Sequence, residues 1–283
     1  MADLINYEGK RVLIVGGATG MGAAAAQKAA ELGAHTIVMD IAEVSYEHGQ
    51  YINVNLVEQA SVDAAVEAVD GPVHVVLACA GVADGTRNLM LINFTSQRHL
   101  VEGLIRSGKL GRGGSVCFIS SAAGMGWLNN LEQVKDFLDT PDWDTAAAWI
   151  DEHEGTDTYT FSKQAVNAYV AVQAFPLLRK GIRANAIMPG PTDTPLARAN
   201  ADLWLGFGSG YREAADVPTL VPEQMGNTML FLGSDAASGI SGISLLVDQG
   251  HTSASLVDVW DDPFVKVMAG IMEFDPAMFG MDE

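Results

Sequence analysis

The alternation of short apolar runs with longer alanine-rich segments constrains the fold of this chain more than any other feature. Seven runs have the length and composition of strands: residues 11–16, 35–40, 51–56, 73–80, 115–121, 183–190 and 244–250. Five segments between them have helical character: residues 20–33, 58–69, 88–107, 157–180 and 222–233. Strands that alternate with helices form βαβ units, and right-handed crossovers then give a doubly wound α/β fold. We therefore expect a seven-stranded, mainly parallel sheet with helices on both faces, within a single domain of residues 1–283.

The first interruption of this alternation lies in residues 127–156. Its acidic and apolar residues predict two short helices, hinged at Thr140 and Pro141 because the residue before a proline disfavours α geometry. We interpret this stretch as a helical insertion before the long helix.

The second interruption, residues 192–221, is predicted to be a substrate lid. Its glycines indicate mobility, and Trp204, Leu205 and Phe207 provide an apolar face. This combination suits a lid over an apolar substrate; an ordinary surface loop docked by its aromatic residues is the alternative.

The third interruption is the C-terminal tail, residues 251–283. Apolar residues recur at helical spacing in 263–274, where methionine and phenylalanine more often serve packing than chemistry. Because an exposed apolar face of this size would favour aggregation, we expect the tail to dock on a neighbouring subunit or over the pocket.

Composition excludes several classes of function. The formal charge of −19 repels a phosphate backbone and an anionic membrane surface, so neither nucleic acid nor a membrane is expected as a partner. No apolar run approaches the roughly 20 residues of a membrane-spanning helix. The N-terminus lacks the basic start and apolar core of a secretory signal, which predicts a cytoplasmic protein. Cys79 and Cys117 lack the spacing of a metal or redox motif, so no metal site is expected.

A glycine-rich turn joins the first predicted strand to the first predicted helix. Gly16, Gly20 and Gly22 allow the backbone to turn sharply and to approach a pyrophosphate. The helix that follows presents free N–H groups and the positive end of its dipole. A glycine triplet alone is weak evidence, but its place between a strand and a helix indicates a dinucleotide site.

The end of the second predicted strand indicates which dinucleotide binds. Asp40 stands where a carboxylate accepts hydrogen bonds from both adenosine ribose hydroxyls and repels a 2′-phosphate. No lysine or arginine stands at Ala18, Thr19 or Ile41 to bind such a phosphate. The pattern therefore favours NAD over NADP, with a plain turn residue as the alternative for Asp40.

The start of the long helix predicts a catalytic site. Tyr159 and Lys163 are four residues apart, so both project from one helix face about one turn apart. A neighbouring ammonium favours a phenolate, so Lys163 should lower the pKa of Tyr159 from its usual value of about 10. Ser120 or Ser121, at the carboxyl end of a strand, can hold a substrate oxygen. An incidental helix pair is the alternative, and the accompanying serine and glycine turn argue against it.

Together these motifs resemble those of the short-chain dehydrogenase/reductase family. The matching segments follow one another over roughly residues 8–250: GGATGMG at 16–22, ISSAAG at 119–124, YTFSK at 159–163, IRANAIMPGPTDT at 182–194 and LLVDQG at 245–250. The resemblance implies a Rossmann-type fold, a homodimer or homotetramer, and an NAD-dependent oxidoreductase that interconverts a secondary alcohol and a ketone or aldehyde.

The resemblance also implies roles for single residues. Tyr159 is expected to be the general acid/base, Lys163 to lower its pKa and bind the nicotinamide ribose, and Ser121 to orient the substrate oxygen. Asn93 matches the asparagine whose backbone holds a water in the proton relay; a helix-bending polar residue is the alternative. The residues expected to contact NAD are Gly16, Thr19, Gly20, Met21, Gly22, Asp40, Ile41, Asn55, Leu56, Ala80, Gly81, Tyr159, Lys163, Pro189, Gly190, Thr192 and Thr194.

The chain departs from the common family pattern in several places. ACAG at 78–81 lacks the family's usual asparagine, and Asn55 stands where an aspartate often contacts adenine. The short gap from Gly81 to Asn93 and the long gap from Ser121 to the catalytic tyrosine resemble the bacterial 3α-hydroxysteroid dehydrogenase/carbonyl reductase subgroup.

That subgroup acts on bulky apolar substrates. We therefore expect a small apolar alcohol or ketone, such as a hydroxysteroid, terpenoid or aromatic carbonyl, contacted by Trp127, Trp204, Leu205 and Phe207. Two other functions stay open. A catalytically silent dinucleotide-sensing regulator would have no need of Tyr159 and Lys163. A nucleotide-sugar epimerase or dehydratase usually has a different glycine spacing and a larger C-terminal substrate domain.

Overall fold

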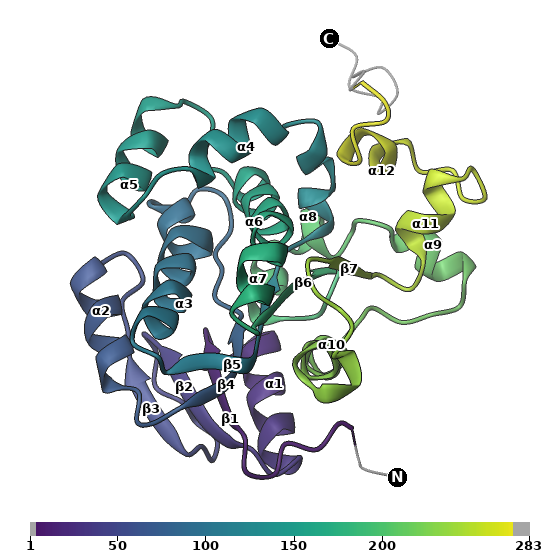
Figure 1. Ribbon diagram of the computed structural model, residues 1–283. Helices are drawn as coiled ribbons and strands as arrows, with labels where there is room; N and C mark the ends of the chain where they lie inside the picture. The colour runs from purple at the N-terminus through teal and green to yellow at the C-terminus, as the bar shows by residue number, and fades with distance from the viewer. Residues whose placement is uncertain (1–3, 274–283) are drawn as a thin grey trace.

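A parallel sheet forms the centre of the computed structural model, which describes residues 4–273 (Figure 1). Its strands are β1 (Arg11–Val15), β2 (His35–Asp40), β3 (Gln50–Asn53), β4 (Val73–Ala78), β5 (Leu110–Ile119), β6 (Arg183–Pro189) and β7 (Ser244–Val247). In these described residues the order is β3-β2-β1-β4-β5-β6-β7, and each neighbouring pair runs parallel. The doubly wound seven-stranded fold is thus confirmed, and the sheet is wholly parallel.

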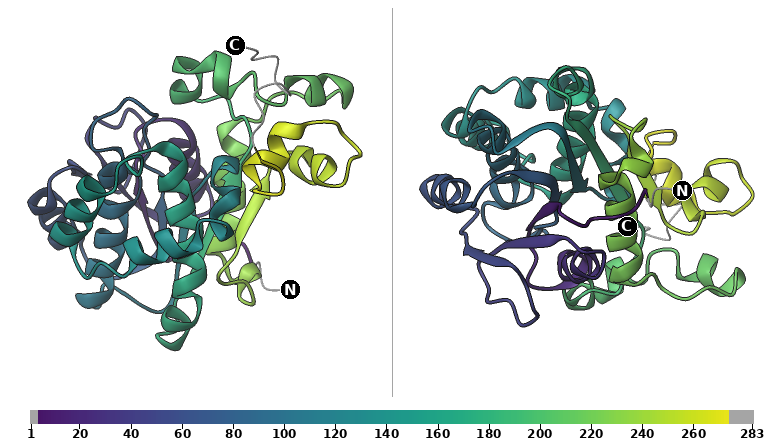
Figure 2. Two further views of the ribbon diagram at one scale, coloured as in Figure 1. Left: turned by 90° about the horizontal axis from the view of Figure 1, so that it is seen from above. Right: turned by 60° about the horizontal axis from the view of Figure 1, so that its bottom comes forward.

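Helices cover both faces of this sheet (Figures 1 and 2). On one face, α1 (Gly20–Glu31) packs against α10 (Pro222–Gly233), and on the other lie α2 (Gln59–Ala68), α3 (Ser96–Arg106) and α6 (Tyr159–Arg179). Each face has its own hydrophobic core. In the sequence the central strands are continuous apolar runs, because both of their faces are buried.

Small residues let α1 and α10 cross closely. A Cβ added at Gly226 would lie 2.9 Å from the backbone nitrogen of Ala25, so only glycine fits there. The alanine-rich face of α1, with Ala25, Ala26 and Ala29 buried, forms the other side of this contact. The crossing holds the start of α1, and with it the glycine turn, at the end of β1.

The helix expected over 88–107 contains an irregular turn. Residues Leu91–Thr95 form a π-helical segment, η1, before α3 begins at Ser96. The expected helix at 157–180 begins at Tyr159, because the Thr158 side chain accepts a hydrogen bond from the backbone N–H of Phe161 and caps it.

The predicted insertion contains two helices, α4 (Leu131–Leu138) and α5 (Trp143–Glu152). The hinge between them lies at Thr140 and Pro141, as expected. A capping box between Asp142 and Thr145 then starts α5. Phe137 and Trp149 pack with ring centroids 5.1 Å apart and join the core on the α6 face.

The expected lid folds as three short helices, α7 (Pro195–Ala199), α8 (Ala201–Trp204) and α9 (Ser209–Ala214). The C-terminal segment adds α11 (His251–Leu256) and α12 (Pro263–Met268), while residues 274–283 of the expected tail lie outside the described part. Figure 2 shows these two segments side by side at one edge of the molecule. Short helices η2 (Ala122–Leu128) and η3 (Asp235–Ala237) complete the elements. Across residues 4–273, no helix combines the length and apolar character needed to span a membrane.

Candidate active site

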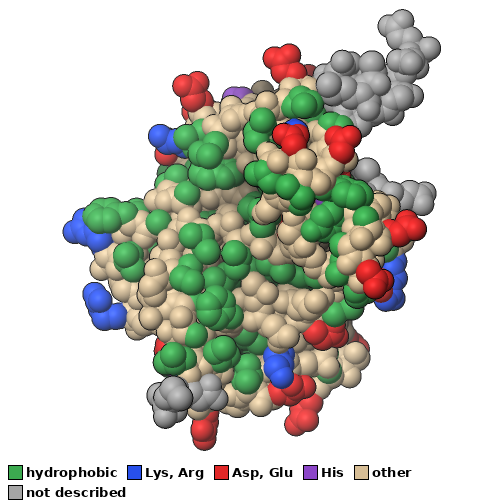
Figure 3. Space-filling view, turned by 90° about the vertical axis from the view of Figure 1, so that its right-hand side faces the viewer, with side chains coloured by type: hydrophobic (Ala, Val, Ile, Leu, Met, Phe, Trp, Pro, Cys, Tyr) green, Lys and Arg blue, Asp and Glu red, His purple; other side chains and the backbone are tan. Residues whose placement is uncertain are grey.

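A cavity of about 1130 Å³ lies at the carboxyl ends of the strands. The strand order reverses between β1 and β4, which is where open α/β sheets bind their ligands. The segments after β1, β2, β4, β5 and β6 all contribute to its lining. In the space-filling view of the side formed by the C-terminal half, hydrophobic side chains gather in the middle and acidic ones lie mainly towards the edges (Figure 3).

The glycine turn has the geometry expected of a phosphate cradle. Gly16 and Gly20 have φ angles of +78° and +58°, a region that glycine enters without strain. A Cβ on Gly16 would lie 2.5 Å from the Cα of Ala80, and one on Gly22 would collide with the carbonyl oxygen of Gly16. In the described structure the Thr19 side chain makes no capping bond to α1, so the first N–H groups of this helix are available to a ligand.

Asp40 is held rigidly at the edge of the cavity. Its two carboxyl oxygens accept hydrogen bonds from the backbone N–H groups of Ala18 (2.9 Å) and Ala42 (3.0 Å). These bonds aim the carboxylate beside the glycine turn, where the ribose of an adenosine would lie. Of the basic side chains in residues 4–273, Lys163 alone lines the cavity.

These features fit a nicotinamide dinucleotide, which supplies or accepts a hydride when bound. Every residue expected to contact the cofactor lines this one cavity: Gly16, Thr19, Gly20, Met21, Gly22, Asp40, Ile41, Asn55, Leu56, Ala80, Gly81, Tyr159, Lys163, Pro189, Gly190, Thr192 and Thr194. The hydroxyl of Thr194 accepts a hydrogen bond from Ala197 N–H (3.0 Å) and caps α7, so it also anchors the first lid helix.

The three expected catalytic side chains meet in the same cavity. Ser121 lies close enough to Tyr159 to lower the pKa of its phenol, and the Lys163 Nζ lies 5.3 Å from the centroid of the Tyr159 ring. The Lys163 ammonium donates to the carbonyl oxygen of Ile119 at the end of β5 (2.9 Å). Strand β5 therefore fixes both the lysine and the serine beside the tyrosine.

The expected lowering of the Tyr159 pKa is wrong for this structure. Desolvation by burial raises the pKa of Tyr159 to about 12, the hydrogen bond with Ser121 lowers it, and the Asp84 carboxylate raises it. Burial also lowers the pKa of Lys163 to about 8. At neutral pH the pair is therefore a neutral phenol beside an ammonium, an arrangement suited to donating a proton to a carbonyl oxygen.

Asn93 lies beneath the cavity rather than in its lining. Its Oδ1 accepts from Val82 N–H (2.8 Å), and its Nδ2 donates to Val82 O (3.1 Å) and to Ser162 Oγ (3.2 Å). Its backbone carbonyl accepts from Gln97 Nε2 (3.0 Å). The Asn93 side chain thus links the segment after β4 to α6. Its contact on α6 is Ser162, the residue before Lys163. The π-helical turn makes this possible by turning Asn93 inward.

Two of the four expected substrate residues line the cavity. Trp204 packs on Tyr159 with ring centroids 4.9 Å apart, and Phe207 packs on Phe264 with ring centroids 5.9 Å apart. Trp127 is not part of the lining, because it packs against the core that α6 shares with the sheet. Leu205 is also absent from the lining: it lies in the turn after α8, where its carbonyl accepts from Arg212 (2.6 Å).

The C-terminal segment forms one wall of the cavity. The sequence predicted only that this segment docks on a neighbouring subunit or over the pocket. Phe264, Val267 and Met268 of α12 line the cavity, so the described part of the tail docks over the pocket. Their helical apolar spacing was the only sequence signal, and it also fits docking on a second subunit.

Two residues of this segment, His251 and Asp262, form a pair against which the lid packs, and we call this contact the lid–tail clamp. His251 is 3% exposed, and its Nε2 lies 2.9 Å from an Asp262 carboxyl oxygen. The rings of Phe207 and Tyr211 flank His251 at 5.1 Å and 4.9 Å. The other Asp262 oxygen caps α12, so the clamp positions both aromatic walls of the cavity.

Asp84, Asn130 and Gln164 also line the cavity and were missed. Asp84 follows the ACAG turn at the carboxyl end of β4, and that position was its only sequence signal. Asn130 Nδ2 donates to Gln164 Oε1 (2.9 Å) across 34 residues of chain, a pairing that no local pattern indicates.

Comparison with known proteins agrees with this geometry. The family model described as short chain dehydrogenase matches residues 10–131, and the model described as Enoyl-(Acyl carrier protein) reductase matches residues 146–252. The 3-alpha-hydroxysteroid dehydrogenase/carbonyl reductase of Comamonas testosteroni is 29% identical, covering 84% of this chain and 95% of the relative. The cis-4-hydroxycyclohexanecarboxylate dehydrogenase of Sinomonas cyclohexanicum is 27% identical, covering 86% and 97%.

A solved structure shows the same fold. The 3-alpha-hydroxysteroid dehydrogenase from Pseudomonas sp. B-0831, crystallised in complex with NADH, has a TM-score of 0.71 at 23% identity, covering 89% of this chain and 100% of that one. With both family models matched in sequence order, the chain belongs to the short-chain dehydrogenase/reductase family of oxidoreductases, whose cofactors are nicotinamide dinucleotides.

Proposed function

We propose that this protein is an NAD-dependent oxidoreductase that interconverts a secondary alcohol and a ketone or aldehyde on a bulky apolar substrate. A hydroxysteroid, a terpenoid or an aromatic carbonyl would suit the site. The observation that carries the proposal is that Tyr159, Lys163 and Ser121 line the same cavity as the glycine turn and Asp40.

The preference for NAD is supported by charge. The fixed Asp40 carboxylate can accept both ribose hydroxyls and would repel a 2′-phosphate. No lysine or arginine lines the adenosine end of the cavity within the described residues, so a 2′-phosphate would find no cation there.

The proton step follows from the positions of three side chains. In the reducing direction, Ser121 holds the carbonyl oxygen and Tyr159 donates its phenolic proton to that oxygen. The Lys163 ammonium then stabilises the phenolate that forms. In the oxidising direction, the alcohol returns its proton to the Tyr159 oxygen.

The apolar substrate is supported by the walls beyond Tyr159. Trp204, Phe207, Phe264, Val267 and Met268 line that end of the cavity and offer apolar surface to a ring system. The two relatives named above share a cyclic alcohol as the substrate in their names, which agrees with this shape.

Two alternative functions fit less well. A dinucleotide-sensing regulator has no use for a phenol and an ammonium that face a cavity beside a serine. An epimerase or dehydratase of nucleotide sugars needs room for a second nucleotide, whereas α12 and the lid occupy the far end of this cavity.

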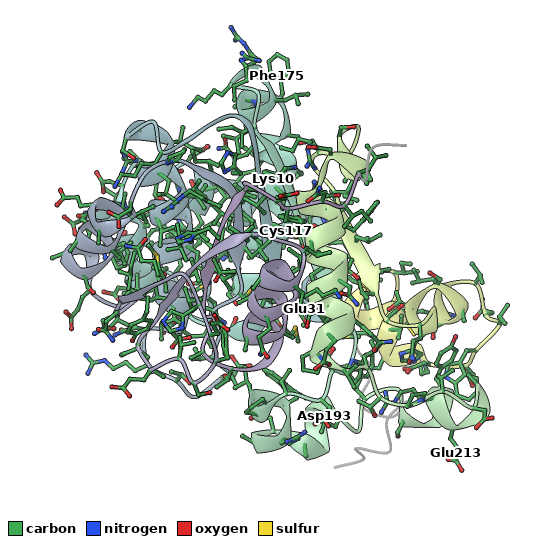
Figure 4. The ribbon with its side chains drawn as sticks, turned by 90° about the horizontal axis from the view of Figure 1, so that it is seen from below. Lys10, Glu31, Cys117, Phe175, Asp193 and Glu213 are labelled. Atoms are coloured by element: carbon green, nitrogen blue, oxygen red, sulfur yellow. The ribbon has the colours of Figure 1, made fainter. Side chains whose placement is uncertain are left out.

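We further propose that the protein works as a homodimer or homotetramer in the cytoplasm, with neither nucleic acid nor a membrane as a partner. Exposed apolar residues on α6 support an oligomer: Phe175 is 71% and Leu178 54% exposed. Figure 4 shows Phe175 projecting outward from the molecule. The charge of −19 supports the exclusion of polyanionic partners.

The test is steady-state oxidation of a diverse panel of alcohols, with NAD and NADP in parallel. We expect NADH formation with cyclic and aromatic secondary alcohols, and at least a tenfold higher kcat/KM with NAD, corresponding to ~1.4 kcal/mol. Tyr159→Phe should abolish turnover and keep NADH binding. Tyr169→Phe makes the same change in the same helix outside the cavity lining, so it should stay active. Oxidation of small polar hydroxy acids or sugars alone would contradict the substrate class.

A further inference from the structure

We propose that the active site selects uncharged substrates and that Asp84 is the residue that excludes carboxylates. This inference rests on the proposed function, because it concerns the same cavity. It narrows the substrate class from bulky apolar alcohols to those that carry no anionic group near the reacting carbon.

Asp84 is fixed next to the reactive phenol. Its Oδ1 accepts a hydrogen bond from the backbone N–H of Tyr159 (2.7 Å), so the carboxylate sits at the first residue of α6. Asp157 makes a reciprocal bond, accepting from Met90 N–H (2.7 Å), and this second bond holds the segment after β4 against the start of α6. Asp84 lines the cavity and is exposed, so its charge faces an arriving substrate.

The one cation in the described lining is buried and leaves the exposed charge of Asp84 largely uncompensated. Lys163 alone contributes a basic side chain to the lining, and its ammonium already donates to the Ile119 carbonyl. The other acid in the lining, Asp40, lies at the adenosine end and is held there by backbone N–H groups. A carboxylate placed near Asp84 would therefore meet a like charge, and the only cation in the described lining is the buried Lys163 ammonium.

The remaining polar groups at this end are neutral. Asn130 and Gln164 form an amide pair, Asn130 Nδ2 donating to Gln164 Oε1 (2.9 Å), and Thr160 and Asn129 also line the cavity. Amides and hydroxyls can pair with a second hydroxyl or carbonyl of a substrate, but they do not neutralise a charge. The apolar walls of Trp204 and Phe207 would strip water from an anion without replacing its hydration.

The experiment compares matched pairs that differ only in charge. 4-Hydroxycyclohexanecarboxylate and 3-hydroxycyclohexanecarboxylate are each tested against the corresponding primary carboxamide, which has nearly the same shape. Each compound is measured as a substrate with NAD and as an inhibitor of the panel alcohol that is oxidised best, so binding is measured with or without turnover. The wild-type enzyme, Asp84→Asn and Glu213→Gln are compared.

Asp84→Asn keeps the side-chain oxygen that accepts from Tyr159 N–H and removes the charge. Glu213→Gln makes the same change in net charge on α9, where Figure 4 shows Glu213 at the outer end of the lid. We expect wild-type enzyme and Glu213→Gln to bind the carboxamides about tenfold or more tightly than the acids. In Asp84→Asn this ratio should fall at least fivefold, mainly through tighter binding of the acids.

Three results would overturn the inference: wild-type enzyme that binds acids and carboxamides equally, a ratio that Asp84→Asn leaves unchanged, or a fall of the same size in Glu213→Gln. If the wild-type enzyme bound none of the four compounds, the inference would also be rejected. The proposed class of cyclic alcohol substrates would be rejected with it. Failure of the proposed function itself is distinguishable, because the alcohol panel would then give no NADH with any compound.

Discussion

Replacing Lys163 by methionine should change how the stability of the cofactor-free protein depends on pH. The lysine is 2% exposed, and burial lowers its pKa from the ordinary value of 10.5 to about 8. Each unit of pKa is worth ~1.4 kcal/mol, so burying the ammonium costs ~3 kcal/mol below the folded-state pKa. Methionine has a similar length and no charge, so Lys163→Met avoids this cost.

The direction of the effect follows from proton binding. Between pH 8 and 10.5 the unfolded chain keeps the Lys163 proton while the folded chain loses it, so the wild-type contribution to stability rises with pH across this window. The stability gained by Lys163→Met should therefore be ~3 kcal/mol larger at about pH 7 than at about pH 10.5. The hydrogen bond to Ile119 is lost in the variant at both pH values.

Urea unfolding followed by tryptophan fluorescence measures this difference. The free energies of unfolding of the wild type and Lys163→Met are compared at several pH values across the window, and only their difference is interpreted, since other groups also titrate there. Lys135→Met, on the exposed face of α4, is the matched control and should show no such trend. A difference that stays constant within about 0.5 kcal/mol from about pH 7 to about pH 10.5 would refute the assignment of a strained buried ammonium.

Three further predictions concern the proton donor, the helix crossing and the clamp. Because Asp84 raises the pKa of Tyr159, Asp84→Asn should move the alkaline limb of the kcat/KM profile for ketone reduction to lower pH; an unmoved limb in a full pH profile would count against this coupling. Gly226→Val should lower the free energy of unfolding by ~3 kcal/mol by forcing α1 from α10, whereas Gly239→Ala, which meets open space, should be nearly neutral in the same denaturation assay. His251→Ala should loosen the walls formed by the lid and α12, raising KM about tenfold for bulky alcohols and little for small ones; equal changes for both would contradict a positioning role.

The sequence alone was enough to predict the sheet, the two helical layers and many of the residues that line the cavity. These depend on local order along the chain: apolar runs that end in glycine or aspartate, and a tyrosine and a lysine one helical turn apart. Parallel strands bring their carboxyl ends to one edge, so residues just after different strands meet without any further information. Gly16, Asp40 and Ser121 line one cavity for this reason.

Tertiary packing decided which residues face the carboxyl edge of the sheet across the cavity. It also decided the pKa values of the catalytic groups at that edge. Trp127 and Trp204 are equivalent in a sequence pattern, yet one packs into the core and the other on Tyr159, because only the folded surface determines which apolar side chain is covered. The Tyr159 pKa has the opposite direction to the one expected from Lys163, since desolvation depends on all the atoms around a group and not on its neighbour one turn away. The charge of Asp84 matters for the same reason: 75 residues separate it from Tyr159 in the chain, and one hydrogen bond joins them in the fold.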